Sequence, residues 1–119
     1  MSTLTRLTDH FTVKEMACSH CGVCLMRDSF MRHLEAFRIA RGEEVVITSG
    51  YRCPDHNRSI GGAKGSQHVK GNAADISTAG LTDNQVEELQ KLALQYFTNA
   101  VIGYGFIHVD EGPKRQWSY

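Results

Sequence analysis

Two histidines and an aspartate in this chain of 119 residues are of the types that hold a metal ion. His68 and Asp75 lie seven residues apart, and His108 follows much later in the segment 106–110. Imidazole nitrogen and carboxylate oxygen both bind zinc, and catalytic zinc typically has three protein ligands and one position open to water. Any one of these residues alone is more often a hydrogen-bonded structural side chain. Taken together, they predict a zinc site with an open position.

The neighbouring residues support this prediction. Gly71 lies between His68 and Asp75, and a glycine permits the tight turn that would bring both side chains to one side. Asp75 stands among alanines and an isoleucine, where an unpaired carboxylate would be costly, so we expect a cation partner. If the segment 106–110 is a strand, His108 and Asp110 point to the same face of the sheet.

The helices that must support this site can be placed from local patterns. Capping boxes at 12–15 and 82–85 predict the starts of two helices. A longer helix is expected to be capped by Asp28 or Ser29 and to end near Gly42.

The remaining segments predict short strands and one long loop. The β-branched run 45–48, the segment 73–76 and the segment 102–109 are typical of strands, the last as one strand or a pair. The stretch 50–65 is rich in glycine, polar and charged residues and is expected to be a loop, which at this length is usually functional. The fold class predicted for 1–119 is a single α+β domain, with a small, mostly antiparallel sheet flanked by helices.

Composition excludes some classes of function. The chain has 13 Lys and Arg against 13 Asp and Glu, so its formal net charge is zero. A balanced chain argues against nucleic acid as the main partner, because phosphate binding needs a concentrated basic surface. No apolar run approaches membrane-spanning length, and the first residues lack the pattern of a signal peptide. We therefore expect synthesis in the cytoplasm without an export signal, and a monomer by default.

The residues of the zinc site also form a longer motif. It closely resembles the motif of the M15 family of zinc D-Ala-D-Ala carboxypeptidases and murein endopeptidases, and it reads Ser66-x-His68-x-x-Gly71-x-Ala73-x-Asp75, with the distal His108 in a His-x-Asp context. The segment 48–57 resembles a loop that precedes this motif in the family, and the resemblance runs from about residue 11 to 117. It implies that His68, Asp75 and His108 are the zinc ligands, and that the fold is the small α+β type shared with the hedgehog signalling domain.

The resemblance also implies an activity: hydrolysis of peptide bonds in the stem peptides of bacterial peptidoglycan, with one catalytic Zn²⁺. Zinc in such a site polarises the scissile carbonyl and lowers the pKa of water. By the resemblance, Arg52 is expected to bind a substrate carboxylate or carbonyl, for which a guanidinium is well suited. Ser66 is expected to orient the site or to contact the substrate. Without the motif, these two would be read as a surface arginine and a turn residue.

The general base is the open point of this mechanism. Many members of the family carry an acid three positions before the last histidine ligand, and here that position is Gly105. Asp110 is the residue predicted to act as the base, with Glu111 and His56 as further candidates. The alternative is that Asp110 accepts a hydrogen bond that fixes an imidazole or an arginine.

Four cysteines form a second group. Cys18, Cys21 and Cys24 share a Cys-x-x-Cys-x-x-Cys spacing, and Cys53 could complete a structural zinc site, with His20 as a further possible ligand. Disulfides are a second reading, and free thiols a third. The sequence does not decide among the three.

Two further classes of function stay open. One is a non-catalytic zinc domain of the same fold that binds a peptide or a partner protein. The other is a metallohydrolase that acts on a different amide. Within the peptidase reading, the sequence does not choose between a terminal D-Ala and an internal bond. Its small size and the absence of an export signal resemble phage or prophage lysis enzymes, which reach the wall through a holin-made hole.

Overall fold

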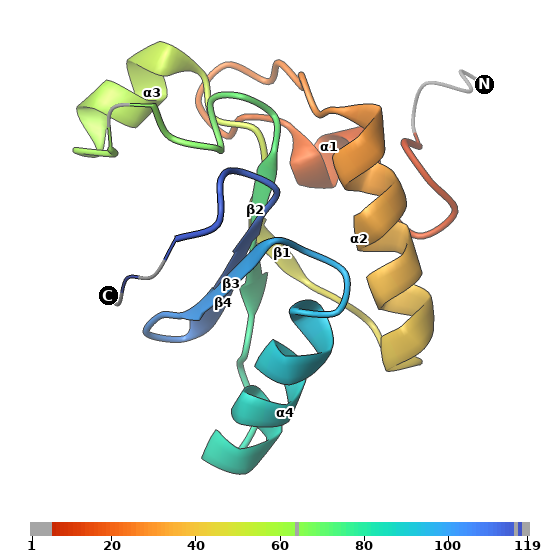
Figure 1. The fold of residues 1–119 in the computed structure, drawn as a ribbon. Helices are drawn as coiled ribbons and strands as arrows, with labels where there is room; N and C mark the ends of the chain where they lie inside the picture. The colour runs from red at the N-terminus through yellow and green to blue at the C-terminus, as the bar shows by residue number, and fades with distance from the viewer. Residues whose placement is uncertain (1–5, 64, 116, 118–119) are drawn as a thin grey trace.

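The computed structural model describes residues 6–63, 65–115 and 117, and its fold is α+β, as predicted (Figure 1). In the described residues, no helix is both long and apolar enough to cross a membrane. The elements in chain order are α1 Val13–Met16, α2 Asp28–Arg41, β1 Ile47–Ser49, α3 Pro54–Ser59, β2 Ala73–Ser77, α4 Asp83–Ala93, β3 Asn99–Ile102 and β4 Phe106–Asp110.

The four strands form one antiparallel sheet in the order β1-β2-β4-β3. The two central strands, β2 and β4, carry the site. Their register places Asp75 directly opposite His108, and the pairing of β3 with β4 places Asn99 opposite Asp110. Opposed residues of adjacent strands have their side chains close together on one face. The pairing therefore brings residues distant in the sequence into contact.

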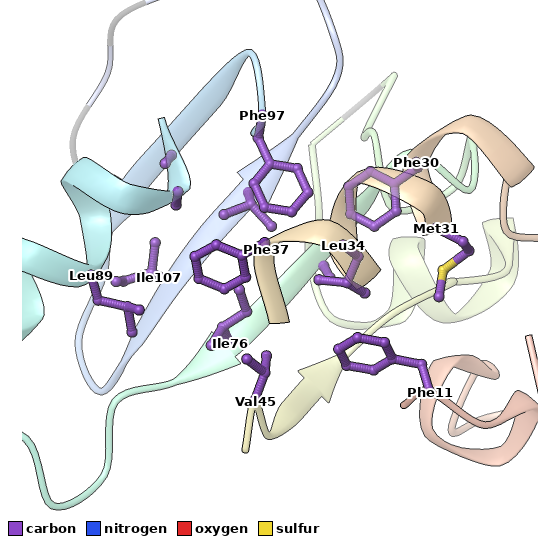
Figure 2. Packing of buried hydrophobic residues seen from close by; sticks show 14 of the residues in the cluster. Phe11, Phe30, Met31, Leu34, Phe37, Val45, Ile76, Leu89, Phe97 and Ile107 are labelled. Carbon is purple, nitrogen blue, oxygen red and sulfur yellow. The ribbon is translucent and has the colours of Figure 1, made fainter. Parts of the chain in front are cut away.

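One face of the sheet packs against α2 and α4, which both lie on that side (Figure 1). Ile107 and Val109 of β4 are fully buried there against α2, whose stripe includes Phe30, Leu34 and Phe37 (Figure 2). Each such apolar side chain stabilises the fold by about 1.5–3 kcal/mol. Because side chains alternate between the two faces along a strand, His108 and Asp110 of β4 point to the opposite face, as predicted.

Both predicted capping boxes are present. The hydroxyls of Thr12 and Thr82 each accept from the backbone N–H three residues on. The expected cap of α2 was wrong: the helix starts at Asp28 after Arg27, which makes no side-chain cap. The backbone N–H of Arg27 instead donates to Gly71 O at 2.8 Å, so one N–H group at this helix end is paired by the turn that precedes β2.

Two other expectations needed correction. The stretch 50–65 is not loop throughout, because it contains α3, with Pro54 at the start of the helix and the Cys53 sulfur accepting from the backbone N–H of His56. Proline is favoured at the first helical position because its missing N–H would be unpaired there anyway. The first strand covers Ile47–Ser49 rather than 45–48, and Val45 lies before it with its side chain buried in the core.

Candidate metal centre

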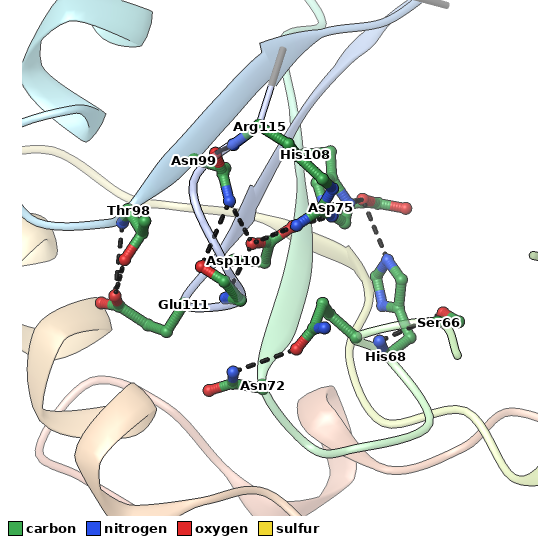
Figure 3. Close-up of polar contacts among 12 residues, drawn as sticks. Ser66, His68, Asn72, Asp75, Thr98, Asn99, His108, Asp110, Glu111 and Arg115 are labelled. Carbon is green, nitrogen blue, oxygen red and sulfur yellow. Dashed lines mark hydrogen bonds and ion pairs between the residues drawn. The ribbon is translucent and has the colours of Figure 1, made fainter. Parts of the chain in front are cut away.

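The three predicted ligands converge on the face of the sheet opposite the core (Figure 3). One ligand atom from each of His68, Asp75 and His108 lies within 4.8 Å of the other two. Asp75 Oδ1 is 3.3 Å from His68 Nε2 and 3.0 Å from His108 Nδ1. The two histidines are buried and Asp75 is half-buried. The structure thus brings together the residues that the sequence selected.

His68 reaches this point because of the turn that precedes β2. Gly71 has φ +70°, and a Cβ at this position would lie 1.8 Å from Leu25 O, so both the conformation and the close approach require glycine. The turn is closed by hydrogen bonds from Gly71 N to His68 O at 3.2 Å and from Asn72 N to Gln67 O at 3.0 Å. The role predicted for Gly71 follows from this geometry.

The hydrogen bond of His68 assigns its tautomer. Its Nδ1 lies 2.8 Å from Gly50 O. A carbonyl only accepts hydrogen bonds, so Nδ1 carries the hydrogen and Nε2 is left with a lone pair. That lone pair faces Asp75. The loop that contains Gly50 therefore orients this imidazole.

His108 is oriented in the same way by a carboxylate. Its Nε2 lies 2.6 Å from Asp110 Oδ2, so Nε2 donates and the lone pair of Nδ1 faces Asp75. When both imidazoles are neutral in these tautomers, two lone pairs and a carboxylate oxygen meet with no hydrogen between them. Such a group of acceptors repels unless a proton or a metal ion lies among them. Two nitrogens and one oxygen are a donor set that fits zinc.

The charges of the site agree with this arrangement. Burial alone would raise the pKa of Asp75, but hydrogen bonds from His108 and His68, which form when these imidazoles are protonated, outweigh burial and hold the pKa well below its ordinary range. Burial alone would lower the pKa of His108, but its hydrogen bonds to Asp110 and Asp75 outweigh burial and raise the pKa. The site is therefore built to keep Asp75 ionised and to favour a cation beside it.

Asp110 is fully buried, and both of its oxygens are already bonded. Besides His108, the carboxylate accepts from Asn99 Nδ2 at 2.9 Å, from Gly112 N at 2.9 Å and from Arg115 Nη2 at 2.7 Å (Figure 3). Burial alone would raise the pKa of Asp110, but these hydrogen bonds outweigh that effect and lower it. Such contacts are typical of a carboxylate that orients a metal-binding histidine.

The site opens into a cleft of about 550 Å³. Arg52 and Ser66 both line it, as the predicted substrate-binding role requires. Arg52 Nη1 donates to Asn57 at 3.0 Å, and Ser66 Oγ accepts from the backbone N–H of His68 at 3.2 Å. Among the described lining residues, Asp75 is the one carboxylate, and Asp110 does not reach the cleft surface.

A larger cavity of about 680 Å³ lies beside α1, but His68, Asp75 and His108 do not line it. Its described lining is largely apolar and includes Val13, Ala17 and Tyr51. A site is defined by its convergent polar groups rather than by volume alone. The smaller cleft is therefore the candidate active site.

Gly105 occupies the position at which many family members carry an acid. It lies in the tight turn between β3 and β4 with φ +82°, and its carbonyl accepts from Thr78 N at 3.0 Å. This backbone conformation favours glycine over an acidic residue. In this chain the position is thus part of the hairpin turn, with a backbone conformation that suits glycine.

Three residues that contribute to the site were not predicted from the sequence. Asn99 and Arg115 hold Asp110, and the Arg115 guanidinium lies 4.2 Å from the ring centre of Trp117. The Trp117 ring also stands edge-on to His108, with ring centres 5.6 Å apart. A single arginine or tryptophan outside any motif is a weak signal in a sequence, and only the tertiary fold places these side chains beside the metal centre.

Comparisons with known proteins identify the family of the chain. The family model described as Peptidase M15 matches residues 9–110. A probable peptidoglycan L,D-endopeptidase MepK of Haemophilus influenzae is 37% identical over 86 residues, which are 65% of this chain and 44% of that protein. The peptidoglycan L,D-endopeptidase MepK of Escherichia coli K12 is 38% identical over 81 residues, covering 61% of this chain and 43% of the relative.

A third relative differs in its named activity. The zinc D-Ala-D-Ala carboxypeptidase of Streptomyces albus G is 30% identical over 95 residues, which are 74% of this chain and 36% of that protein. The chain thus spans less than half the length of these relatives. The fold is α+β, and the site brings together His68, Asp75 and His108, which could hold a metal ion. The chain belongs to the peptidase M15 family, as its motif predicted.

Proposed function

We propose that this chain is a zinc-dependent peptidase that hydrolyses peptide bonds in the stem peptides of peptidoglycan. The observation that carries the proposal is the convergence of His68, Asp75 and His108, with lone pairs directed at one point, beside a cleft. Membership of the peptidase M15 family and the activities for which the relatives are named support the same activity.

The metal would be held by His68 Nε2, His108 Nδ1 and a carboxylate oxygen of Asp75. A zinc ion bound there supplies Lewis-acid chemistry, because it polarises a peptide carbonyl and lowers the pKa of water. The protein contributes a fixed tautomer at each imidazole, through Gly50 O and Asp110. Neither histidine then has to reorganise before it binds the metal.

Arg52 is proposed to bind a carboxylate or carbonyl of the stem peptide. Arg52 lines the cleft, and Asn57 holds its Nη1 at 3.0 Å. A guanidinium held in place beside the cleft is suited to bind a carboxylate with two parallel hydrogen bonds. Ser66 is proposed to support the site by holding the backbone of His68.

Asp110 is proposed to orient His108 rather than to act as the base. Its burial and its four described partners leave no oxygen facing the cleft. The prediction from the sequence, in which Asp110 takes a proton from water, remains the competing hypothesis. Zinc affinity separates the two roles, because only the orienting role requires the carboxylate for metal binding.

The activities named for the relatives suggest which peptide bond of the stem peptide is cut. The relatives with 37–38% identity are named as L,D-endopeptidases, and the carboxypeptidase has 30% identity. We favour cleavage of an internal L,D bond of the stem peptide over removal of the terminal D-Ala. Purified peptidoglycan digested with the protein, followed by mass analysis of the fragments, decides between these bonds.

The same digestion tests the activity itself. We expect fragments to appear with the zinc-loaded protein and to disappear with a chelator or in the His68→Ala variant. Intact peptidoglycan after incubation with a zinc-loaded protein would contradict the proposal and favour a non-catalytic domain that binds a peptide. A role in phage or prophage lysis stays a prediction, and a neighbouring holin gene would support it.

A further inference from the structure

A second cluster of ligand groups lies outside the cleft. One sulfur from each of Cys18, Cys21 and Cys53 lies within 4.8 Å of the other two, and no disulfide joins the described cysteines. The first two follow α1, and the third precedes α3, so the cluster joins segments that are more than thirty residues apart in the sequence. A shared metal ion would explain why three sulfurs from two separate segments lie so close together.

The backbone around the first two cysteines has the geometry of a metal-binding turn. Cys18 and Cys21 have the two-residue spacing typical of zinc sites. The turn is closed by hydrogen bonds from Gly22 N to Cys18 O and from Cys18 N to Val23 O, both 2.8 Å. Gly22 has φ +76°, and a Cβ placed there would meet nothing within 4 Å, so its conformation alone requires glycine.

Backbone N–H groups already point at the sulfurs. Cys53 N donates to Cys18 Sγ at 3.4 Å, and His56 N donates to Cys53 Sγ at 3.4 Å. Such hydrogen bonds stabilise the negative charge that a zinc-bound sulfur carries. The two segments are thus joined in an arrangement that suits thiolate ligands.

His20 supplies a fourth donor. Its Nδ1 lies 3.5 Å from Cys53 Sγ, and its ring is stacked on His56 at 5.6 Å. Zinc bonds of about 2.3 Å to sulfur and about 2.0 Å to nitrogen, at a tetrahedral angle, separate the two ligand atoms by about 3.5 Å. The distance from His20 to Cys53 is the one expected when both bind one metal, although His20 lies outside the group formed by the three sulfurs. Cys24 also lies outside that group, and it packs against the hydrophobic core.

We propose that Cys18, His20, Cys21 and Cys53 bind a second zinc ion with a structural role. The ligand set is closed, with three sulfurs and one nitrogen, which is typical of structural sites. It replaces the four-cysteine site considered from the sequence, because Cys24 is exchanged for His20. The inference does not depend on the proposed peptidase activity, since a metal here is four-coordinate and has no open position.

This metal would brace the loop that orients the catalytic site. Tyr51 N donates to Met16 O at 2.7 Å, and a Cβ on Gly50 would lie 2.6 Å from that oxygen, so the loop packs closely against the end of α1. The same loop carries Gly50 O, which holds His68, and Arg52. A metal that joins Cys53 to the segment after α1 would therefore help to hold Gly50 O and Arg52 in place.

The test is metal content and cobalt spectroscopy on the full chain. We expect two zinc ions per chain in the wild type and one in Cys21→Ser, which alters an exposed residue and should fold. Cys24→Ser is the matched control and should keep two. In Co²⁺-substituted protein, thiolate-to-cobalt charge-transfer absorption should persist in His68→Ala and disappear in Cys21→Ser.

Three results would overturn the inference. These are a wild type that binds one zinc without thiolate absorption, a Cys24→Ser variant that loses as much metal as Cys21→Ser, and an intact mass two hydrogens low, which indicates a disulfide. An unchanged cobalt spectrum in His20→Ala would remove His20 from the ligand set. If peptidoglycan stays uncut while two zinc ions are present, the proposed function fails and this inference stands.

Discussion

Replacing Asp110 with asparagine separates its two candidate roles. Asparagine has nearly the same shape, but its amide nitrogen donates and cannot accept. Each oxygen of Asp110 accepts from at least two donors, so the new amide nitrogen meets donors in either orientation. The backbone N–H of Gly112 cannot adapt, whereas the imidazole of His108 can change tautomer and the partly exposed Arg115 can turn to water.

We therefore expect the amide nitrogen to face His108, whose proton then moves to Nδ1. That atom faces Asp75 and is the proposed zinc ligand, and a protonated nitrogen cannot bind zinc. Loss of such an orienting partner typically weakens metal binding about 10–100-fold, which corresponds to about 1.4–2.7 kcal/mol. The change should appear in zinc affinity before it appears in the chemistry.

The assay is zinc affinity by competition with a chromophoric chelator, combined with turnover of a stem peptide at controlled free zinc. All proteins carry Cys21→Ser, so that metal bound by the cysteines does not contribute. Weaker zinc binding with turnover restored at saturating zinc supports the orienting role. Unchanged zinc affinity with turnover lost at every zinc concentration would refute this reasoning and establish Asp110 as the base.

Glu111→Gln is the matched control, since it makes the same acid-to-amide change one residue away. Glu111 accepts from Thr98 N and Oγ1 at 3.2 and 2.7 Å, outside the cleft. Its substitution should leave zinc affinity unchanged. A similar loss in both variants would mean that general destabilisation, and not the tautomer of His108, explains the effect.

The glycine turn, the charge of His108 and the guanidinium of Arg52 can each be tested separately. Gly71→Ala should destabilise the fold by more than about 2 kcal/mol in urea unfolding, whereas Gly80→Ala, with φ +82° and open space, should cost only about 1 kcal/mol; equal costs would show that the close approach to Leu25 O is unimportant. The raised pKa of His108 means that, without zinc, its contribution to stability is complete below about pH 6.5 and lost as pH rises through the folded pKa. Zinc affinity should change in the opposite direction, rising with pH as the competing proton leaves, and parallel pH trends in unfolding and calorimetric titrations would contradict this. Arg52→Gln should raise KM for the stem peptide about tenfold or more while zinc content stays constant; an unchanged KM would remove it from substrate binding.

Local patterns in the sequence predicted much of this structure. The capping boxes at Thr12 and Thr82 depend on residues three apart, and both formed. Gly42 ends α2 with φ +73°, as a glycine after a helix predicts. The ligand motif was also local for His68 and Asp75. These features need no knowledge of the sheet.

The parts that were missed depend on contacts between distant segments. Asn99 meets Asp110 only because β3 and β4 pair in one particular register. At the start of α2, the backbone N–H of Arg27 donates to Gly71 O, which lies more than forty residues away in the sequence, and no local side chain caps the helix. Cys24 lies outside the cluster of the other three cysteines and packs against the core. The spacing of residues in the sequence does not predict these contacts between distant segments.

The metal centre is the feature on which the proposed activity depends most, and a crystal structure with anomalous data collected at the zinc edge tests it directly. We predict an anomalous peak about 2.0–2.2 Å from His68 Nε2, His108 Nδ1 and an oxygen of Asp75, with the fourth position free of protein groups. A zinc-loaded crystal with no peak between these three residues, or with a fourth protein ligand closing the site, would contradict this prediction.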